Sequence, residues 1–254
     1  MKSMREECEY ILAEAKKQNV LLRAIGGMAV HIHCPEASIL PAIKREYGDL
    51  DFVTVSPDDQ RMRKFFNSIN FSANSRFNAL QGKTRMIFNN PDNTWYIDVF
   101  INEFRMCHNI QFNNDRLLKD PVSIPLAELL LTKLQIIEIN LKDVKDIAAI
   151  LIEHPLGDND IEAVNVKRII EITSNDWGFA TTARNNIDKI PLLLNTLDLP
   201  EEKSQMIKDK LGELAKSIDK APKSTNWKLR AILGKSKKWY EEPEDAARDE
   251  LKLE

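Results

Sequence analysis

The stretch GDLDFV, residues 48–53, places two carboxylates two residues apart in a run that otherwise has the composition of a buried strand. Side chains alternate between the two faces of a strand, so Leu50 and Phe52 can face a core while Asp49 and Asp51 point together to the other side. Two like charges about 7 Å apart along the backbone repel one another unless a cation or water lies between them. The pattern therefore indicates a strand whose acidic face has a partner elsewhere in the sequence.

The composition bounds the class of protein. The chain has 254 residues, 43% of them hydrophobic and 30% charged, which is typical of a soluble globular protein with a sizeable core. Its net charge of -3 predicts no general attraction to nucleic acid or membranes, so such a partner would need a local patch. Three cysteines without CxxC spacing, no signal peptide and no membrane span together predict a cytoplasmic location.

The apolar periodicity of the first part of the chain predicts mixed secondary structure. Helical spacing favours helices over residues 4–19, 28–34 and 56–69, with Ser56 as the cap of the third. Apolar and β-branched runs favour strands over residues 20–25, 49–55, 76–80, 84–90, 94–101 and 106–112. Pro91-Asp92-Asn93 is predicted to form a hairpin turn.

The second part of the chain has no convincing strand pattern after Pro125. Helices are predicted over residues 125–139, 142–154, 161–173, 183–197, 201–218 and 224–239. The fold class is therefore α/β (α+β), with a mixed sheet followed by an all-helical part. We place the domain boundary near Asp120-Pro121, giving domains 1–120 and 121–254, the second ending in a charged tail.

Two other segments can face the acidic pair. Gly26-Gly27 lies between a strand and a helix, where glycines let a phosphate approach the free N–H groups of a helix start, although a plain turn is the commoner explanation. Asp98 lies in the apolar run WYIDVFI, residues 95–101, where an unpaired carboxylate would be costly unless its face is solvated. If the two acidic strands are neighbours, three carboxylates meet beside a phosphate cradle. Such hard oxygen ligands suit Mg²⁺, or Mn²⁺, together with a substrate phosphate.

These motifs resemble the nucleotidyltransferase superfamily with the DNA polymerase β-type fold. Its signature is hG[GS], a short helix, Dh[DE]h and a later h[DE]h, matched here by Ile25-Gly26-Gly27, residues 49–52 and Ile97-Asp98-Val99. The resemblance implies that Asp49 and Asp51 bind the metals and that Asp98 is a third ligand that helps to activate an acceptor hydroxyl. Gly27 stands where many members have Ser, so its phosphate contact would rest on backbone N–H groups.

The segment after these motifs narrows the resemblance. PLAELLLTKLQIIEINLKDVKDIAAIL, residues 125–151, is similar to the segment that follows the catalytic domain in AbiEii-type toxin nucleotidyltransferases. Lys133 lies on an apolar stripe and either snorkels to solvent or reaches a triphosphate. Asp143 and Asp146 share a helix face and are either solvated helix acids or part of the nucleotide site. The resemblance leaves open an antitoxin-like protein partner.

Two basic features remain. From Lys220 to Tyr240 there are seven Lys or Arg residues, no acid, and three aromatic residues, a pattern suited to phosphate contact with base stacking but also to a solvated amphipathic helix. Lys44 and Arg45 precede the acidic strand, and we expect them to be an exposed loop pair.

The predicted reaction is the Mg²⁺-dependent transfer of a nucleoside monophosphate from an NTP to an acceptor hydroxyl. RNA, such as a tRNA end, is the favoured acceptor because of the Lys220–Tyr240 segment. A small molecule such as an antibiotic, or a protein side chain, would fit the same chemistry. A catalytically silent nucleotide-binding module is the alternative from another class, and the presence of all three acids argues against it.

Overall fold

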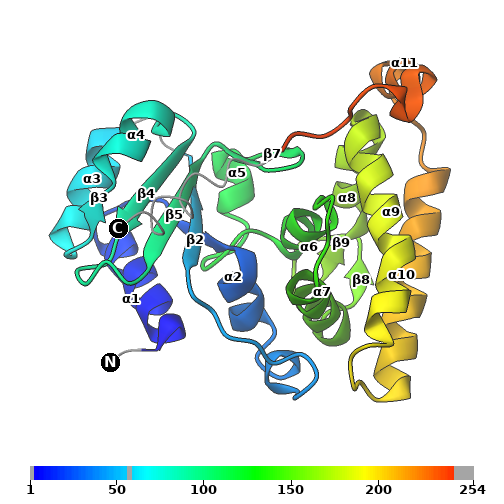
Figure 1. The fold of residues 1–254 in the computed structure, drawn as a ribbon, viewed down its shortest axis with the longest axis horizontal. Helices are drawn as coiled ribbons and strands as arrows, with labels where there is room; N and C mark the ends of the chain where they lie inside the picture. Colours follow the sequence, from blue (N-terminus) through cyan, green and yellow to red (C-terminus); the bar gives the residue numbers. More distant parts are fainter. Residues whose placement is uncertain (1–2, 56–58, 243–254) are drawn as a thin grey trace.

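The computed structural model describes residues 3–55 and 59–242. A mixed sheet with its helices forms one side of the molecule, and a set of longer helices forms the other (Figure 1). Within the described residues, no helix is long and apolar enough to cross a membrane. The predicted fold class, α/β with a helical C-terminal part, is confirmed.

The main sheet has five strands in the order β1-β2-β5-β4-β3. Their bounds are β1 Arg23–Ile25, β2 Leu50–Thr54, β3 Ser72–Ala73, β4 Arg85–Asn89 and β5 Tyr96–Ile101. Only the central pair, β2 and β5, is parallel, while β1, β4 and β3 run antiparallel to their neighbours. The parallel pair places the two acidic strands side by side.

The helices and small strands around this sheet come from the first half of the chain. They are α1 Met4–Lys17, α2 Gly26–His33, α3 Asp59–Ser68, α4 Ser75–Gln81, α5 Asn114–Leu117 and the hairpin strands β6 Glu103–Arg105 and β7 Asn109–Gln111. Of these, α2 follows β1 directly and packs against β1 and β2. The chain therefore brings a helix N-terminus to the acidic strand.

The second half of the chain is almost wholly helical. Its elements are α6 Leu126–Leu134, α7 Leu141–Glu153, α8 Val166–Asn175, α9 Trp177–Leu194, α10 Glu201–Lys220, α11 Thr225–Leu233 and the short parallel strands β8 Leu156–Gly157 and β9 Val164–Asn165. Helix α6 packs against α2 as well as against α7, α8 and α9. It is thus the helix that carries the second half up to the sheet.

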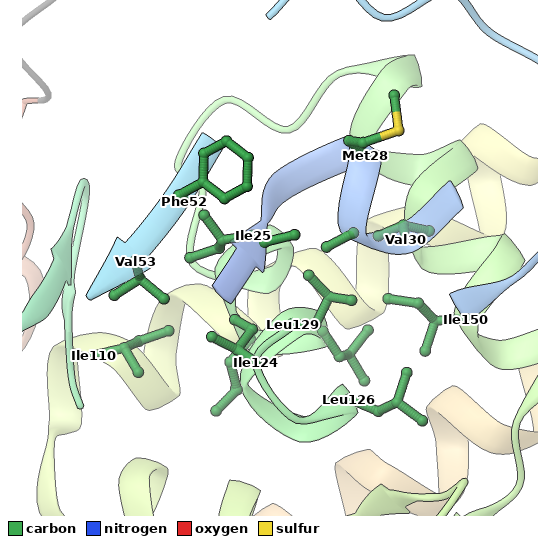
Figure 2. Close-up of a cluster of buried hydrophobic side chains, with 14 of the residues drawn as sticks. Ile25, Met28, Val30, Phe52, Val53, Ile110, Ile124, Leu126, Leu129 and Ile150 are labelled. Atoms are coloured by element: carbon green, nitrogen blue, oxygen red, sulfur yellow. The ribbon is translucent and has the colours of Figure 1, made fainter. Parts of the chain in front are cut away.

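One continuous apolar core joins the two halves. Figure 2 shows Ile25 and Phe52 from the sheet, Met28 from α2, Leu129 from α6 and Ile150 from α7 in the same cluster. All five side chains are at most 3% exposed, so their burial contributes about 1.5–3 kcal/mol each to folding. This core holds α6, and with it Lys133, at a fixed position beside β2. The boundary near Asp120-Pro121 stays a prediction.

Several predicted elements differ from the structure. Residues 76–80 were predicted as a strand but belong to α4, because the Asn74 side chain caps the Phe77 N–H at 3.0 Å and starts a helix. The Asn78 side chain then exchanges two hydrogen bonds with the backbone of Ile87, at 2.7 and 2.9 Å. The prediction of no strand after Pro125 is wrong for the two-residue strands β8 and β9.

Several helix ends differ from the predicted ones, because capping residues set the ends and the apolar periodicity does not. Helices α8 and α9 begin at the caps Asn165 and Asp176, later and earlier than the apolar pattern suggested. Helix α11 stops at Gly234, whose φ of 55° ends it before residue 239. The predicted cap Ser56 and the tail from residue 243 lie outside the described residues.

Candidate active site

Two of the three acids predicted as metal ligands lie at adjacent positions of the sheet. Asp51 of β2 and Asp98 of β5 are directly opposite one another in the parallel register, so their side chains point to the same face. Asp49 is exposed and comes just before β2. The strand register therefore places Asp51 and Asp98 on one side of the sheet.

A cavity of about 220 Å³ opens over this face. Its lining residues are Gly26, Asp49, Asp51, Arg85, Tyr96, Asp98, Phe100, Phe104, Met106, Thr132, Lys133 and Ile136. They come from the sheet, from the β6–β7 hairpin region and from α6. The two halves of the chain thus build this cavity together.

The carboxylates of the cavity are under electrostatic strain. Burial raises the pKa of Asp51 well above its ordinary value, and the negative charges of Asp49 and Asp98 raise it further. Burial also raises the pKa of Asp98, although its ion pair with Arg85 opposes the shift. Both shifts mean that a further positive charge in the cavity would be stabilising.

The donor set fits a hard divalent cation, because Mg²⁺ and Mn²⁺ bind carboxylate oxygens and keep several positions for water and phosphate. The side chains of Asp49 and Asp51 have no hydrogen bond or ion pair with the side chain of any other described residue. Within residues 3–55 and 59–242, however, no three His, Cys, Asp or Glu side chains form a ready-made metal cluster. Asp98 is instead paired with Arg85.

Gly26 lets a helix N-terminus abut the acidic strand. Helix α2 starts at Gly26, and its cap residue Ile25 offers no side-chain hydrogen bond to the first turn. Gly26 has φ of 73°, and a Cβ there would collide with the Asp51 carboxylate oxygen Oδ2. Backbone N–H groups of an uncapped first turn are an anion-binding feature, so the start of α2 is suited to receive a phosphate beside the Asp51 carboxylate.

Gly26→Ala is expected to destabilise the protein by roughly 1–2 kcal/mol from the left-handed backbone alone, with a further loss from the collision with Asp51. Urea unfolding measures the effect. The matched control is Gly212→Ala in α10, where a Cβ meets nothing within 4 Å. That change is expected to be neutral or to stabilise the protein by up to about 1 kcal/mol. Equal stabilities of the two variants would contradict the close approach at Gly26.

Lys133 lies between the cavity and a buried acidic pair on α7. Its Nζ is 2.8 Å from Asp146 Oδ2 and 3.4 Å from Asp143 Oδ1. Burial by itself lowers the pKa of Lys133, but the two carboxylates raise it above the ordinary value, which keeps the amine charged. Asp143 also closes the capping box of α7 with Asn140. Neither acid lines the cavity, so the structure brings them to Lys133 and not to the space where a nucleotide would bind.

Arg45 differs from its prediction as an exposed loop residue, whereas Lys44 is exposed. The Arg45 Nη2 donates to Asp146 Oδ2 at 3.0 Å, and its Nε lies 2.9 Å from Oδ1 of the same carboxylate. The guanidinium packs on Gly27, where a Cβ would collide with it. Asp146 therefore holds two cations, Arg45 and Lys133, next to the start of α2.

Arg85 is a site residue that sequence reasoning missed. It lies on β4, outside every motif, and its guanidinium donates to both carboxylate oxygens of Asp98. The sequence shows only that Arg85 is a cationic residue in a predicted strand that precedes the WYIDVFI strand. Its pairing with Asp98 depends on the register of β4 and β5, which the sequence does not reveal.

The basic segment Lys220–Tyr240 runs from the end of α10 through α11 and returns to the β6–β7 hairpin (Figure 1). The Trp239 indole donates to Thr182 Oγ1 at 3.1 Å, and the Glu241 N–H donates to Cys107 O at 3.0 Å. The two acids that follow the segment, Glu241 and Glu242, line a second cavity of about 290 Å³, which is lined also by Arg85, Phe100 and Met106. Because those three residues line the first cavity too, the two cavities are neighbours.

No family model matches the chain, and no curated protein matches it significantly. Among solved structures, the lincosamide antibiotic adenylyltransferase LnuA with bound lincomycin is 17% identical, with a TM-score of 0.33, over 46% of this chain and 73% of that one. An antigenic nucleotidyltransferase-like protein from Paracoccidioides brasiliensis is 15% identical, with a TM-score of 0.40, over 87% of this chain and 94% of that one. TM-scores this low do not support a shared function, so function must follow from the geometry of the site.

Proposed function

We propose that the chain is a nucleotidyltransferase that moves a nucleoside monophosphate from an NTP to an acceptor hydroxyl. The observation that carries the proposal is the parallel register of Asp51 with Asp98, beside Asp49, in one cavity with Gly26 and Lys133. Three carboxylates, a helix N-terminus and a buried amine are the groups that phosphoryl transfer needs, since its transition state is stabilised mainly by positioning and charge.

Each group has a part in the step. The start of α2 and Lys133 would bind and orient the triphosphate, and Asp49 and Asp51 would hold Mg²⁺ with Asp98 as third ligand. The bound metal supplies charge neutralisation at the reacting phosphate. The acceptor oxygen forms a bond to the α-phosphorus, the bond from that phosphorus to the bridging oxygen breaks, and pyrophosphate leaves. In this proposal Asp98 takes the hydroxyl proton.

The proposal extends to the type of enzyme. Lys133 with Asp143 and Asp146 supports a place among AbiEii-type toxin nucleotidyltransferases, because the Lys133 Nζ lies 3.4 Å from the first carboxylate and 2.8 Å from the second. A cytoplasmic location and an antitoxin-like protein partner belong to the same proposal.

RNA is the proposed acceptor, because the basic segment Lys220–Tyr240 ends directly before Glu241, which lines the cavity that adjoins the site. Incubating the protein with each α-labelled NTP, Mg²⁺ and total RNA tests the whole proposal. Label incorporated into RNA supports it. Label found only on protein or on a small molecule would show that this molecule, and not RNA, is the acceptor. If no NTP gave labelled product, the proposed function would be wrong.

Changing Lys235, Lys237 and Lys238 together to Gln is expected to weaken RNA binding and flatten its salt dependence. Each lost phosphate contact should reduce the log–log salt slope by about 0.7, the value for single strands. All three side chains are exposed, so their replacement leaves the fold unchanged. Filter binding of labelled RNA from low to moderate salt measures the slope.

The matched control changes three other exposed lysines, Lys167, Lys189 and Lys216, to Gln, which alters the net charge equally. This control should keep the wild-type slope. NTP binding should be nearly unchanged in both triple variants, because the triphosphate is assigned to the start of α2, the metals and Lys133. Equal losses of RNA binding in the two variants would show a general charge effect and remove the segment from the proposal.

A further inference from the structure

Arg85 separates the candidate active site from the neighbouring cavity. Its side chain is 19% exposed, and that of its partner Asp98 is 4% exposed. The Nε donates to Oδ1 at 2.9 Å and to Oδ2 at 3.0 Å, and Nη2 donates to Oδ2 as well. Both oxygens of the third carboxylate are therefore engaged by one guanidinium.

Those oxygens are the ones that a metal ion would need. A carboxylate whose two oxygens face a bidentate guanidinium has its strongest acceptor directions occupied. Asp51 and Asp49, in contrast, have no such partner among the described residues. All three acids line one cavity, yet within residues 3–55 and 59–242 no three His, Cys, Asp or Glu side chains form a metal cluster.

We infer that Arg85 is an internal counter-ion that competes with the divalent cation for Asp98, so that the metal site is completed when the guanidinium leaves the carboxylate. The inference rests on the proposed function, because it takes Asp98 as a metal ligand. A buried carboxylate without a cation is strongly unfavourable, and Arg85 supplies that cation in the metal-free protein. A bound divalent cation would supply that charge in its place, and Asp98 would then no longer need the Arg85 guanidinium.

The backbone fixes where the exchange can happen. Arg85 pairs with Phe100, and Ile87 with Asp98, in the antiparallel register of β4 and β5, so only the side chain can move. The guanidinium already lies 5.1 Å from the Phe100 ring and 5.7 Å from the Phe77 ring. Both rings line the second cavity together with Glu103, which offers the released cation aromatic faces and a carboxylate.

Competition has a measurable consequence. Asp98 can bind a metal only in the fraction of molecules in which Arg85 does not occupy it. The apparent Kd for the metal is the intrinsic Kd divided by that fraction. Removing Arg85 should therefore tighten metal binding, but only while Asp98 is present to act as the ligand. A merely structural role of Arg85 predicts no gain in affinity. A general effect of removing one positive charge predicts the same gain whether or not Asp98 is a carboxylate.

The test is a double-mutant cycle read out by Mn²⁺ binding, followed by electron paramagnetic resonance without nucleotide. Arg85→Gln is expected to lower the Kd for Mn²⁺ about tenfold or more relative to wild type. Asp98→Asn is expected to raise it. Adding Arg85→Gln to Asp98→Asn should then change the Kd by less than about twofold, because the competing pair no longer exists. Equal tightening in both backgrounds, or no tightening in either, would overturn the inference.

Two further measurements guard the result. Arg85→Lys keeps the charge but cannot engage both oxygens, so its Kd should lie between those of wild type and Arg85→Gln, and it replaces the latter if that variant does not fold. The Tm of Arg85→Gln should be lower than that of wild type in chelator and should rise more with Mn²⁺. If neither wild type nor any variant binds Mn²⁺ with or without NTP, the proposed function is wrong. If wild type binds Mn²⁺ and Arg85→Gln binds it with the same Kd, only the role of Arg85 is wrong.

Discussion

Asp51→Asn is expected to lower kcat/KM for nucleotide transfer at least about 10³-fold, a loss of about 4 kcal/mol of transition-state stabilisation. Asp51 is directly opposite Asp98 and next to the start of α2, so in the proposed function it faces both the metal and the phosphate. The amide is nearly the same size as the carboxylate but lacks the negative charge. The variant therefore removes the metal attraction without removing the packing.

Thermal unfolding separates this effect from damage to the fold. In wild type, Mg²⁺ with NTP should raise the Tm more than either ligand alone, since each ligand at 100 times its Kd adds about 2.7 kcal/mol. Asp51→Asn should lose the joint effect. The matched control is Asp188→Asn on α9, an exposed acid outside the cavity, which should keep both the activity and the joint effect. Joint stabilisation that persists in Asp51→Asn would mean that the ligands bind elsewhere.

The metal-free protein should respond to Asp51→Asn in the opposite direction. The pKa of Asp51 is higher in the folded protein than in the unfolded chain, so protonation of Asp51 favours the folded state. This contribution to the free energy of unfolding is present at low pH and is lost as the pH rises through the folded-state pKa. The ionised carboxylate thus costs stability near neutral pH, and the amide does not. In the presence of a chelator, Asp51→Asn should have a higher free energy of unfolding than wild type. The difference should be absent below about pH 4 and should grow as the pH rises.

Local sequence patterns predicted the acidic face of the site well. Alternation in a strand placed Asp49 and Asp51 on the same face, and the strand–glycine–helix order placed Gly26 at the strand-to-helix junction where α2 starts. These features depend on residues that are neighbours in the chain, where periodicity and turn chemistry have a direct physical meaning. The resemblance to a known motif set then supplied the expectation that the two strands pair.

The cations of the site could not be predicted in the same way. Arg85 reaches Asp98 from the next strand, and Arg45 reaches Asp146 from 101 residues away in the chain. The partner of a single arginine depends on sheet register and helix packing. No periodic pattern in the sequence around the arginine can therefore identify that partner. The prediction of Arg45 as exposed was wrong for that reason.

The buried ion cluster of Glu128 was invisible to the sequence for a related reason. Glu128 occupies the first turn of α6, a usual place for an exposed acid, yet it is 0% exposed. Arg116 from α5 donates to its two oxygens at 2.7 and 2.8 Å, and Arg168 from α8 donates at 2.8 Å. One carboxylate thus ties an element beside the sheet to two helices of the second half.

Glu128→Ala is expected to lower the free energy of unfolding by about 3–5 kcal/mol, because it leaves two partly buried guanidinium groups without their shared carboxylate. The matched control is Glu171→Ala, which removes a carboxylate that also pairs with Arg168 at 2.8 Å but is 63% exposed. Exposed ion pairs contribute about 0–1 kcal/mol, so this control should unfold at nearly the wild-type urea concentration. Since α6 carries Lys133 to the cavity, Glu128→Ala should also weaken NTP binding, whereas Glu171→Ala should not. Equal midpoints of the two variants would show that Glu128 does not hold α6 in place.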